Sequence, residues 1–457
     1  MTDASDKEAD GKGRSMRRPA PTESAAPMFL TQDYAIRPVP EAERKPFLNV
    51  SVTTGAWVIA MSTLWTGSVL AQGMPFAMVV NATILGMGIL VAYGAFMGWL
   101  GARYGVSTTV LAREAFGRVG SSLLGIVFAL TLGIGWFGWQ IAFFAQTLAT
   151  MFPDAWLASY QPAVVWGGSL MILTAFIGYR ALSALSMFAV PLIVALSAWG
   201  LWVSLGAATQ ATPLEATMSL FEGVSIVVGN AALGAVIFPD LTRYARTASV
   251  GALATCGGYF LGGVLAVLAG AAITASAGTA AGNLPAAMAA VGMGFFAFLI
   301  LLFAQWTTND NNLYSGALGL ANVVRLPKSV LCIAMGVVGV LIALSGVENY
   351  FVPYLNFLSS YVPPIAGVVI ADHWIVKRVL EQRDYKFGPG AQHAGINWLA
   401  VASVLAGGFL GGSLGFGITP INAIAIAFVL HAGGSVLLRM VGLSAEIGRS
   451  VEDHTGF

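Results

Sequence analysis

The sequence has few charged residues, few histidines and almost no cysteine. Only 9% of its 457 residues are Asp, Glu, Lys or Arg, against about 25% in an average soluble protein. The four histidines are scattered along the chain, and the two cysteines form neither a metal motif nor a disulfide framework. A catalytic cluster of a nucleophile with its base, or of histidines with acids, is not expected. These shortages argue against an enzyme, and no cofactor is expected.

Hydrophobic side chains and glycine are abundant instead. Hydrophobic residues make up 57% of the chain, the mean hydropathy is +0.78 and there are 55 glycines. This composition predicts an all-α polytopic membrane protein whose helices pack closely through small residues. Twelve apolar segments are each about long enough to cross roughly 30 Å of hydrocarbon. They are residues 48–72, 76–101, 120–150, 162–179, 183–207, 219–238, 249–275, 287–318, 329–346, 350–372, 396–416 and 419–440.

The positive charges lie on one side of this twelve-span arrangement. All 22 Lys and Arg residues fall on that side, in the terminal segments, in loops or, for Arg439, at the end of the last span; the loops on the other side carry only acids. By the positive-inside rule both termini are cytoplasmic, in an integral protein of the plasma membrane, the inner membrane of a bacterium. Residues 1–45 are rich in charge and lack apolar periodicity, which predicts a disordered cytoplasmic tail. Residues 46–440 form the helical domain, and 441–457 a second cytoplasmic tail.

The order of the spans suggests an internal repeat. Five spans are an odd number, so residues 46–207 and 213–372 would be two five-span units of opposite orientation, with helices 11 and 12 (396–440) added. The first span of each unit is interrupted by small and polar residues, at 53–63 and at 229–234. Broken helices 1 and 6 would free backbone carbonyls for a cation and helix ends for a substrate. Glycine-rich interruptions also occur where helices simply cross, so the two explanations stay open.

The most polar stretch inside any span is Gln305-Trp306-Thr307-Thr308-Asn309-Asp310-Asn311-Asn312, which follows a strongly apolar run. Hydrocarbon offers such groups no hydrogen-bond partners, so they must face a cavity, an ion or another helix. The hydroxyls of Thr307 and Thr308 are neutral hard oxygen ligands suited to a small cation. The sequence therefore predicts a cation and substrate site inside a membrane transporter. Asp310 could carry a coupling proton or pair with a cytoplasmic arginine, and we favour the pairing.

The third span supplies a candidate platform for a flat ligand. Trp136 and Gln140 are one helical turn apart and share a face, and flanking glycines leave room for a ring to approach. An indole on which a ring can stack, with an amide one turn away, could recognise a planar heterocycle that bears donors and acceptors. The alternative is an interfacial or lipid-facing tryptophan.

Several motifs together resemble the cytosine permease branch of the nucleobase:cation symporter-1 family. They are Trp-Thr-Thr-Asn-Asp-Asn at 306–311, Leu-Trp-Thr-Gly at 64–67, Gly-Trp-Phe-Gly at 135–138 and Val-Pro-Pro-Ile-Ala-Gly-Val-Val-Ile-Ala-Asp at 362–372. The resemblance implies twelve helices with a five-plus-five inverted repeat, and symport of a nucleobase-like ring with sodium or a proton by alternating access. It also implies a sodium site between spans 1 and 8, formed by the hydroxyls of Thr307 and Thr308 and by backbone carbonyls near Ala56 and Ala60.

The expected substrate pocket departs from this family pattern. Alignment places Ala232 and Gly234 where cytosine permeases have serines near an aromatic residue, and Ala304, followed by Gln305, where they have an asparagine. With Trp136 and Gln140, we therefore expect the substrate to contact Gln305, Asn309, Asn311, Ala232 and Gly234. Cytosine or a related ring is the first expectation. A purine, hydroxymethylpyrimidine, hydantoin or allantoin, or an amino acid on the same fold, is the alternative. Besides substrate and lipid bilayer, no partner is expected, neither nucleic acid nor protein.

Overall fold

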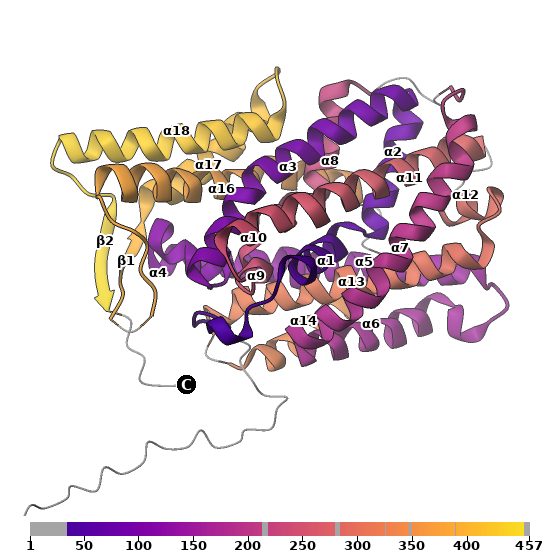
Figure 1. Cartoon of the computed structure of the whole chain (residues 1–457), viewed down its shortest axis with the longest axis horizontal. Coiled ribbons are helices and arrows are strands. Elements are labelled where there is room, and N and C mark those ends of the chain that lie inside the picture. Colours follow the sequence, from indigo (N-terminus) through magenta and orange to yellow (C-terminus); the bar gives the residue numbers. More distant parts are fainter. Residues whose placement is uncertain are drawn as a thin grey trace, which may run out of the picture.

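The computed structural model describes residues 34–212, 218–278, 284–324, 326–346, 350–388 and 390–451, which are almost entirely helical (Figure 1). The first half comprises η2 (Glu41–Glu43), α1 (Phe47–Val58), α2 (Met61–Gly73), α3 (Phe76–Tyr104), α4 (Thr108–Phe128), η3 (Ala129–Trp136), α5 (Phe137–Met151), η4 (Trp156–Ala158), α6 (Tyr160–Ile177) and α7 (Tyr179–Ala208). The second half comprises α8 (Leu220–Val236), α9 (Pro239–Thr242), α10 (Ala248–Ala254), η5 (Thr255–Phe260), α11 (Leu261–Ala277), α12 (Leu284–Ala290), α13 (Gly294–Ala321), α14 (Lys328–Ala343), α15 (Phe351–Tyr361), α16 (Pro363–Ala371), η8 (Asp372–Leu380), β1 (Gln392–Asn397), α17 (Trp398–Ser413), α18 (Thr419–Met440) and β2 (Glu446–Val451).

Each of the twelve expected spans overlaps one of these helices or a run of consecutive ones. By length and apolar composition, eight helices of the described residues could cross a membrane, and α1 with α2 would make a ninth if the bent pair is one span. α14 and α17 are apolar but only 16 residues long. The predicted all-α polytopic class is confirmed, while the count of twelve crossings and the inverted repeat stay predictions.

The expected break in the first span is present. α1 and α2 meet at an angle of 51° across Ile59 and Ala60. The Ile59 N–H donates to the Gly55 carbonyl and the Ala60 N–H to that of Val58. The bond from Ala60 departs from the regular helical pattern, in which each N–H donates to the carbonyl four residues earlier. The carbonyls of Ala56 and Trp57 are thereby released from the helix.

The expected break at 229–234 is wrong, because these residues lie inside continuous α8, which ends only at Val236. The small residues there serve close helix contacts. A Cβ atom on Gly229 would lie 2.3 Å from the Leu355 carbonyl oxygen, and one on Gly234 would lie 2.2 Å from the Tyr259 hydroxyl. The glycine-rich run is therefore a surface for helix crossing rather than an interruption.

Both terminal segments differ from the expected tails. Residues 1–33 lie outside the described part, but residues 34–45 already pack on the helices: Val39 N–H donates to the Gly105 carbonyl, and Arg243 donates to that of Tyr34. In the C-terminal segment, β2 pairs antiparallel with β1, so a small two-stranded sheet joins an otherwise helical fold. Local composition does not reveal that these segments are ordered, because their order comes from contacts with distant parts of the chain.

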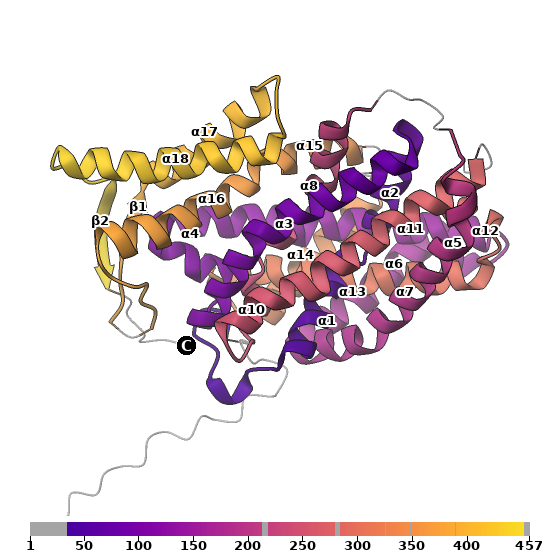
Figure 2. The same cartoon turned by 45° about the horizontal axis from the view of Figure 1, so that its top comes forward.

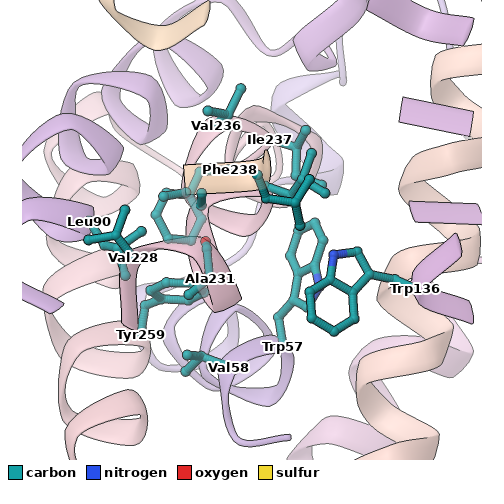
Figure 3. Close-up of a cluster of buried hydrophobic side chains, with 14 of the residues drawn as sticks. Trp57, Val58, Leu90, Trp136, Val228, Ala231, Val236, Ile237, Phe238 and Tyr259 are labelled. Carbon is teal, nitrogen blue, oxygen red and sulfur yellow. The ribbon is translucent and has the colours of Figure 1, made fainter. Parts of the chain in front are cut away.

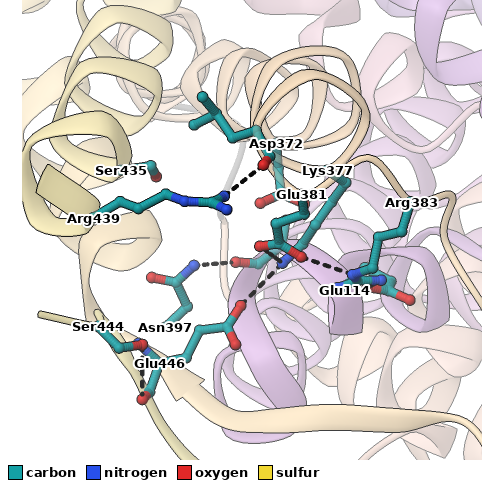
Figure 4. A network of polar contacts seen from close by, with 12 residues as sticks. Glu114, Asp372, Lys377, Glu381, Arg383, Asn397, Ser435, Arg439, Ser444 and Glu446 are labelled. Carbon is teal, nitrogen blue, oxygen red and sulfur yellow. Dashed lines mark hydrogen bonds and ion pairs between the residues drawn. The ribbon is translucent and has the colours of Figure 1, made fainter. Parts of the chain in front are cut away.

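Ion pairs fasten this sheet and its neighbouring loop to the bundle (Figure 4). Lys377 Nζ lies 3.0 Å from both Glu381 Oε1 and Glu446 Oε1. Arg383 contacts Glu381 at 2.7 Å and the nearly buried Glu114 of α4 at 3.0 Å. Both Lys377 and Glu114 are removed from water, and each is neutralised by its own partners: Glu381 and Glu446 for Lys377, and Arg383 for Glu114. Figures 1 and 2 show α17 and α18 side by side along one edge of the molecule, with the sheet at one end of this pair.

Candidate functional site

A small cavity of about 20 Å³ lies among α1, α2, η3, α5, α8, η5 and α13. It therefore adjoins the break between α1 and α2 and the polar stretch of α13. A volume of this size is close to what one ordered water molecule needs, and a six-membered ring needs several times more. Binding of such a ring therefore requires side chains or helices around the cavity to move apart.

Three aromatic side chains form much of the wall: Trp57, Trp136 and Tyr259. Figure 3 shows the indoles of Trp57 and Trp136 next to each other, with Tyr259 beyond Ala231. Trp136 ends the π-helix η3, where the helix is locally widened, and its ring meets Tyr354 edge-on with centroids 5.5 Å apart. The Tyr354 hydroxyl donates to the Thr131 carbonyl inside η3 at 3.0 Å. The irregular turn and Tyr354 together set the position of the Trp136 ring.

Some side-chain amides at the cavity have a donor or an acceptor that no described protein group uses. Gln140 is fully buried, and neither its amide oxygen nor its amide nitrogen has a protein partner. Asn230 donates to Thr63 Oγ1 at 2.9 Å, which leaves its oxygen unpartnered. A buried amide without partners costs about 1–3 kcal/mol. This cost is recovered when a ligand supplies the missing donor and acceptor.

Beside the cavity, four oxygen atoms converge between α1 and α13. Thr308 Oγ1 lies 3.4 Å from the Ala56 carbonyl oxygen and 3.3 Å from that of Trp57, and Thr307 Oγ1 lies 3.3 Å from the Ala56 oxygen. The Thr307 hydroxyl has a shorter bond, 2.9 Å, to the Phe303 carbonyl one turn earlier. We call these four atoms, Thr307 Oγ1, Thr308 Oγ1 and the carbonyl oxygens of Ala56 and Trp57, the oxygen cluster.

The spacing and chemistry of the oxygen cluster fit a monovalent cation. Hydroxyl-to-carbonyl hydrogen bonds are usually about 2.7–2.8 Å long, so the contacts of 3.3–3.4 Å are long for such bonds. Oxygens about 2.4 Å from one ion, as around calcium, which has nearly the radius of sodium, lie about 3.4 Å apart when they are at right angles. All four donors are neutral, which suits sodium better than a divalent ion.

The structure brings only some of the predicted site residues together. Trp136, Gln140 and Gly234 line the cavity. The Ala56 carbonyl and both threonine hydroxyls form the oxygen cluster, but the Ala60 carbonyl instead accepts bonds from the N–H groups that begin α2. The fourth oxygen comes from Trp57, whose carbonyl the break at Ile59 and Ala60 frees from the helix.

Four other predicted substrate contacts do not line this cavity: Ala232, Gln305, Asn309 and Asn311. The Asn309 amide donates to the Phe137 carbonyl, and the Asn311 amide donates to the Thr307 carbonyl in its own helix. Gln305 and Ala232 are fully buried. Their predicted contact with substrate has no support in this geometry and stays a prediction.

Sequence reasoning missed Trp57, Asn230, Tyr259 and Asn312 as cavity residues. A signal for Asn312 was present, since it follows Thr308 by four residues and therefore shares its helix face. Asn230 is the one polar residue of the glycine-rich run at 229–234. Nothing in the sequence marks Trp57 or Tyr259, because aromatic residues are common throughout the spans.

Asp310 lies away from both the cavity and the oxygen cluster. Its Oδ1 accepts a hydrogen bond of 2.5 Å from Thr174 Oγ1 of α6, and that hydroxyl also accepts from the Trp306 indole at 2.9 Å. No ion pair with arginine is found for it among the described residues. Arg325, which follows α13, lies outside these residues, so the pairing that we favoured from the sequence stays a prediction. A proton carried by Asp310 would have to act on the substrate from outside the cavity.

Comparisons with known proteins agree with this geometry. A family model described as permease for cytosine/purines, uracil, thiamine, allantoin matches residues 38–433. Cytosine permease of Escherichia coli K12 is 32% identical over 406 residues, covering 87% of this chain and 93% of that protein. Hydantoin permease of Microbacterium maritypicum is 26% identical over 371 residues, covering 72% of this chain and 73% of that protein.

The fold has a close counterpart among solved structures. Mhp1, a nucleobase-cation-symport-1 family transporter in a closed conformation with bromovinylhydantoin bound, superimposes with a TM-score of 0.74 at 21% identity. The match covers 88% of this chain and 95% of Mhp1. The same arrangement of helices occurs in a sodium-coupled sialic acid symporter, with a TM-score of 0.64 at 12% identity, over 90% of this chain and 95% of that one. These relatives are transporters, not enzymes, and the chain belongs to the family of integral membrane permeases for cytosine, purines, uracil, thiamine and allantoin.

Proposed function

We propose that this protein imports cytosine or a related nucleobase-like heterocycle by symport with a cation, sodium being favoured, through alternating access. One observation carries the proposal: Thr308 belongs both to the wall of the cavity and to the oxygen cluster. A bound ring and a bound cation would therefore both contact this residue. The relatives named cytosine permease and hydantoin permease support a ring of this chemistry.

The groups around the cavity favour a flat, uncharged substrate. Trp136 and Trp57 offer aromatic faces, and the Gln140 amide offers a donor and an acceptor to one edge of a ring. Cytosine, purines, hydroxymethylpyrimidine, hydantoin and allantoin all carry such edges. Of the described residues, those that line the cavity include no Asp, Glu, Lys or Arg. An amino-acid zwitterion, which needs compensation of two charges, is therefore the weaker alternative.

Sodium is favoured over a proton because of the donors. The oxygen cluster consists of hydroxyl and carbonyl oxygens, which bind a hard cation without a change in protonation. Asp310, the acid nearest in sequence, contacts Thr174 and not the cluster. Proton coupling stays the alternative, and it would operate through Asp310.

Coupling follows from the position of the oxygen cluster between α13 and the end of α1, just before the break. A cation held by Ala56 and Trp57 from α1, and by Thr307 and Thr308 from α13, would fix the angle between these helices. The same helices carry walls of the substrate cavity. If both ligands favour one conformation, each raises the affinity for the other by the same factor.

The test is thermal stabilisation of the detergent-purified chain by a panel of cytosine, adenine, uracil, hydantoin, allantoin, hydroxymethylpyrimidine and amino acids, each in sodium or potassium chloride. A ligand that binds only the folded protein raises its melting temperature. We expect at least one flat ring to do so more strongly in sodium. Stabilisation by amino acids alone would overturn the substrate, and equal shifts in both salts at fixed pH would overturn sodium coupling. Uptake of the same ring into proteoliposomes along a sodium gradient then tests transport.

We also propose that the protein resides in the plasma membrane with both termini in the cytoplasm. The proposal depends on the placement of all 22 Lys and Arg residues on one side of the twelve-span arrangement. Protease digestion of sealed vesicles with a tagged C-terminus distinguishes the two orientations.

A further inference from the structure

Trp57 makes two contacts with α13 through two different parts of the residue. Its backbone carbonyl oxygen lies 3.3 Å from Thr308 Oγ1, in the oxygen cluster. Its indole N–H donates to Asn312 Oδ1 at 2.9 Å. Thr308 and Asn312 are one helical turn apart on the same face of α13, and Trp57 is only 6% exposed. One residue of α1 thus contacts a candidate cation ligand and a residue of the substrate cavity.

The indole determines how the Asn312 amide is oriented. An indole N–H can only donate a hydrogen bond, so it selects the oxygen of the amide. The amide nitrogen of Asn312 then faces elsewhere; it is buried, and no group of the described residues accepts from it. Asn312 lines the cavity. The cavity therefore presents a hydrogen-bond donor from Asn312 for as long as the Trp57 indole holds the amide oxygen.

We propose that Trp57 is the positioning residue that links cation binding to substrate binding: its carbonyl helps to bind the cation, and its indole aims the Asn312 N–H at a hydrogen-bond acceptor on the substrate ring. The inference rests on the proposed function and names a residue through which its coupling operates. The substrate consequently carries a ring carbonyl or an unprotonated ring nitrogen at the edge that meets Asn312.

The helix break makes such a link sensitive to the cation. Trp57 lies in the last turn of α1, two residues before the break, where its carbonyl is free of the regular helical pattern. A cation that draws this carbonyl and Thr308 together also fixes the backbone from which the indole extends. When the cation is absent, α1 can turn relative to α13, and the indole no longer holds the Asn312 amide in one orientation. A substrate that accepts from Asn312 favours the same arrangement, as reciprocity requires.

The test compares W57F, N312A and the double variant in the full-length purified protein. The probe is cytosine, or the panel compound with the largest sodium-dependent shift. Three dissociation constants are measured: the ring in sodium, the ring in potassium, and sodium alone. W57F removes the N–H but keeps an aromatic ring and the backbone carbonyl. We expect its ring affinity in sodium to fall about tenfold and the advantage of sodium over potassium to shrink, with affinity for sodium alone nearly unchanged.

The double variant shows whether the indole acts through Asn312. If it does, W57F added to N312A costs little further affinity, because the group that it positions is already gone. W65F is the matched control: Trp65 lies in α2, packs edge-on against Phe143 and does not line the cavity. We expect W65F to leave all three constants near those of the wild type.

The outcomes separate this inference from the function on which it rests. A wild-type protein that binds no ring of the panel overturns the proposed function. A wild type with sodium-dependent binding that W57F retains in full, or additive losses in the double variant, overturns the role of Trp57. If sodium no longer stabilises W57F, that substitution has disrupted the oxygen cluster itself, and the test then depends on N312A. Full sodium dependence of ring binding in N312A contradicts the inference.

Discussion

Replacing Thr308 by valine tests the oxygen cluster directly. The substitution removes one hydroxyl and keeps the β-branched shape. The contacts of this hydroxyl with the Ala56 and Trp57 carbonyls are 3.3–3.4 Å long, so they contribute little as hydrogen bonds. We therefore expect T308V to change the free energy of unfolding in potassium by less than about 1 kcal/mol. Its effect in sodium should be larger, because a ligand of the ion is lost.

The size of that effect can be worked out from the interaction lost. A contact with a charged partner contributes about 2 kcal/mol, which corresponds to a roughly 30-fold weaker dissociation constant. Sodium at 100 times the wild-type dissociation constant stabilises the wild type by about 2.7 kcal/mol, and at the same concentration would stabilise the variant by about 0.9 kcal/mol. The assay is the sodium concentration that produces a fixed rise in melting temperature, which should increase roughly 30-fold by the same estimate.

A matched control separates ion binding from general loss of a buried hydroxyl. Thr66 is also fully buried, and its hydroxyl donates to the Ser62 carbonyl within α2 at 2.8 Å. T66V should leave the sodium concentration that produces this fixed rise unchanged. The reasoning is refuted if T308V also keeps the wild-type sodium concentration, because a hydroxyl that can be removed without consequence is not a ligand.

Three further predictions concern the cavity, the helix contacts and the loop after η8. Q140L should weaken ring binding at least tenfold, whereas sodium alone should still stabilise the protein. Titrations with each ligand separately check this, and an equal loss of both affinities would mean misfolding. G270A should cost about 1–3 kcal/mol, read as a lower melting temperature, because a Cβ there would lie 1.9 Å from the Leu64 carbonyl oxygen; an unchanged melting temperature would contradict the close contact between α2 and α11. The hydrogen bond from Arg103 lowers the pKa of Asp384 to about 2, below its value of about 3.9 in an unfolded chain. Asp384 therefore stabilises the fold above about pH 4, and this contribution is lost as the pH falls through about 2. The melting temperatures of D384N and the wild type should differ at pH 6 and converge with acidification; a constant difference would refute this.

The sequence was most informative where polar groups interrupt an apolar helix. Thr307 and Thr308 had to face protein or an ion, and Trp136 and Gln140 had to share a face, so these positions followed from solvation and helix geometry alone. The sequence could not show how far α13 is rotated about its axis. That rotation puts Thr308 and Asn312 at the cavity and turns Asn309 towards α5 instead.

The position of each helix break was also hidden from the sequence. Glycine permits a break, but it equally permits the close approach of another helix, and only the neighbours decide between the two. Gly229 meets the backbone of α15, and Gly234 meets Tyr259, so α8 stays continuous. In α1 the break falls at Ile59 and Ala60, and it leaves the Trp57 carbonyl free to join the oxygen cluster. Packing between distant segments therefore determined what local composition left open.

Because η3 is a π-helix, the number of residues in this segment helps to determine the direction in which Trp136 and Gln140 face. A π-helical turn accommodates an additional residue in an α-helix, and successive residues of an α-helix are rotated by about 100°. Deletion of one residue between Ala129 and Trp136 would let the segment relax to an ordinary helix. Trp136 and Gln140 would then turn together by about a quarter of a revolution relative to α4. A change in length, with every side chain of the platform retained, could thus reassign this permease to a different ring or abolish recognition altogether.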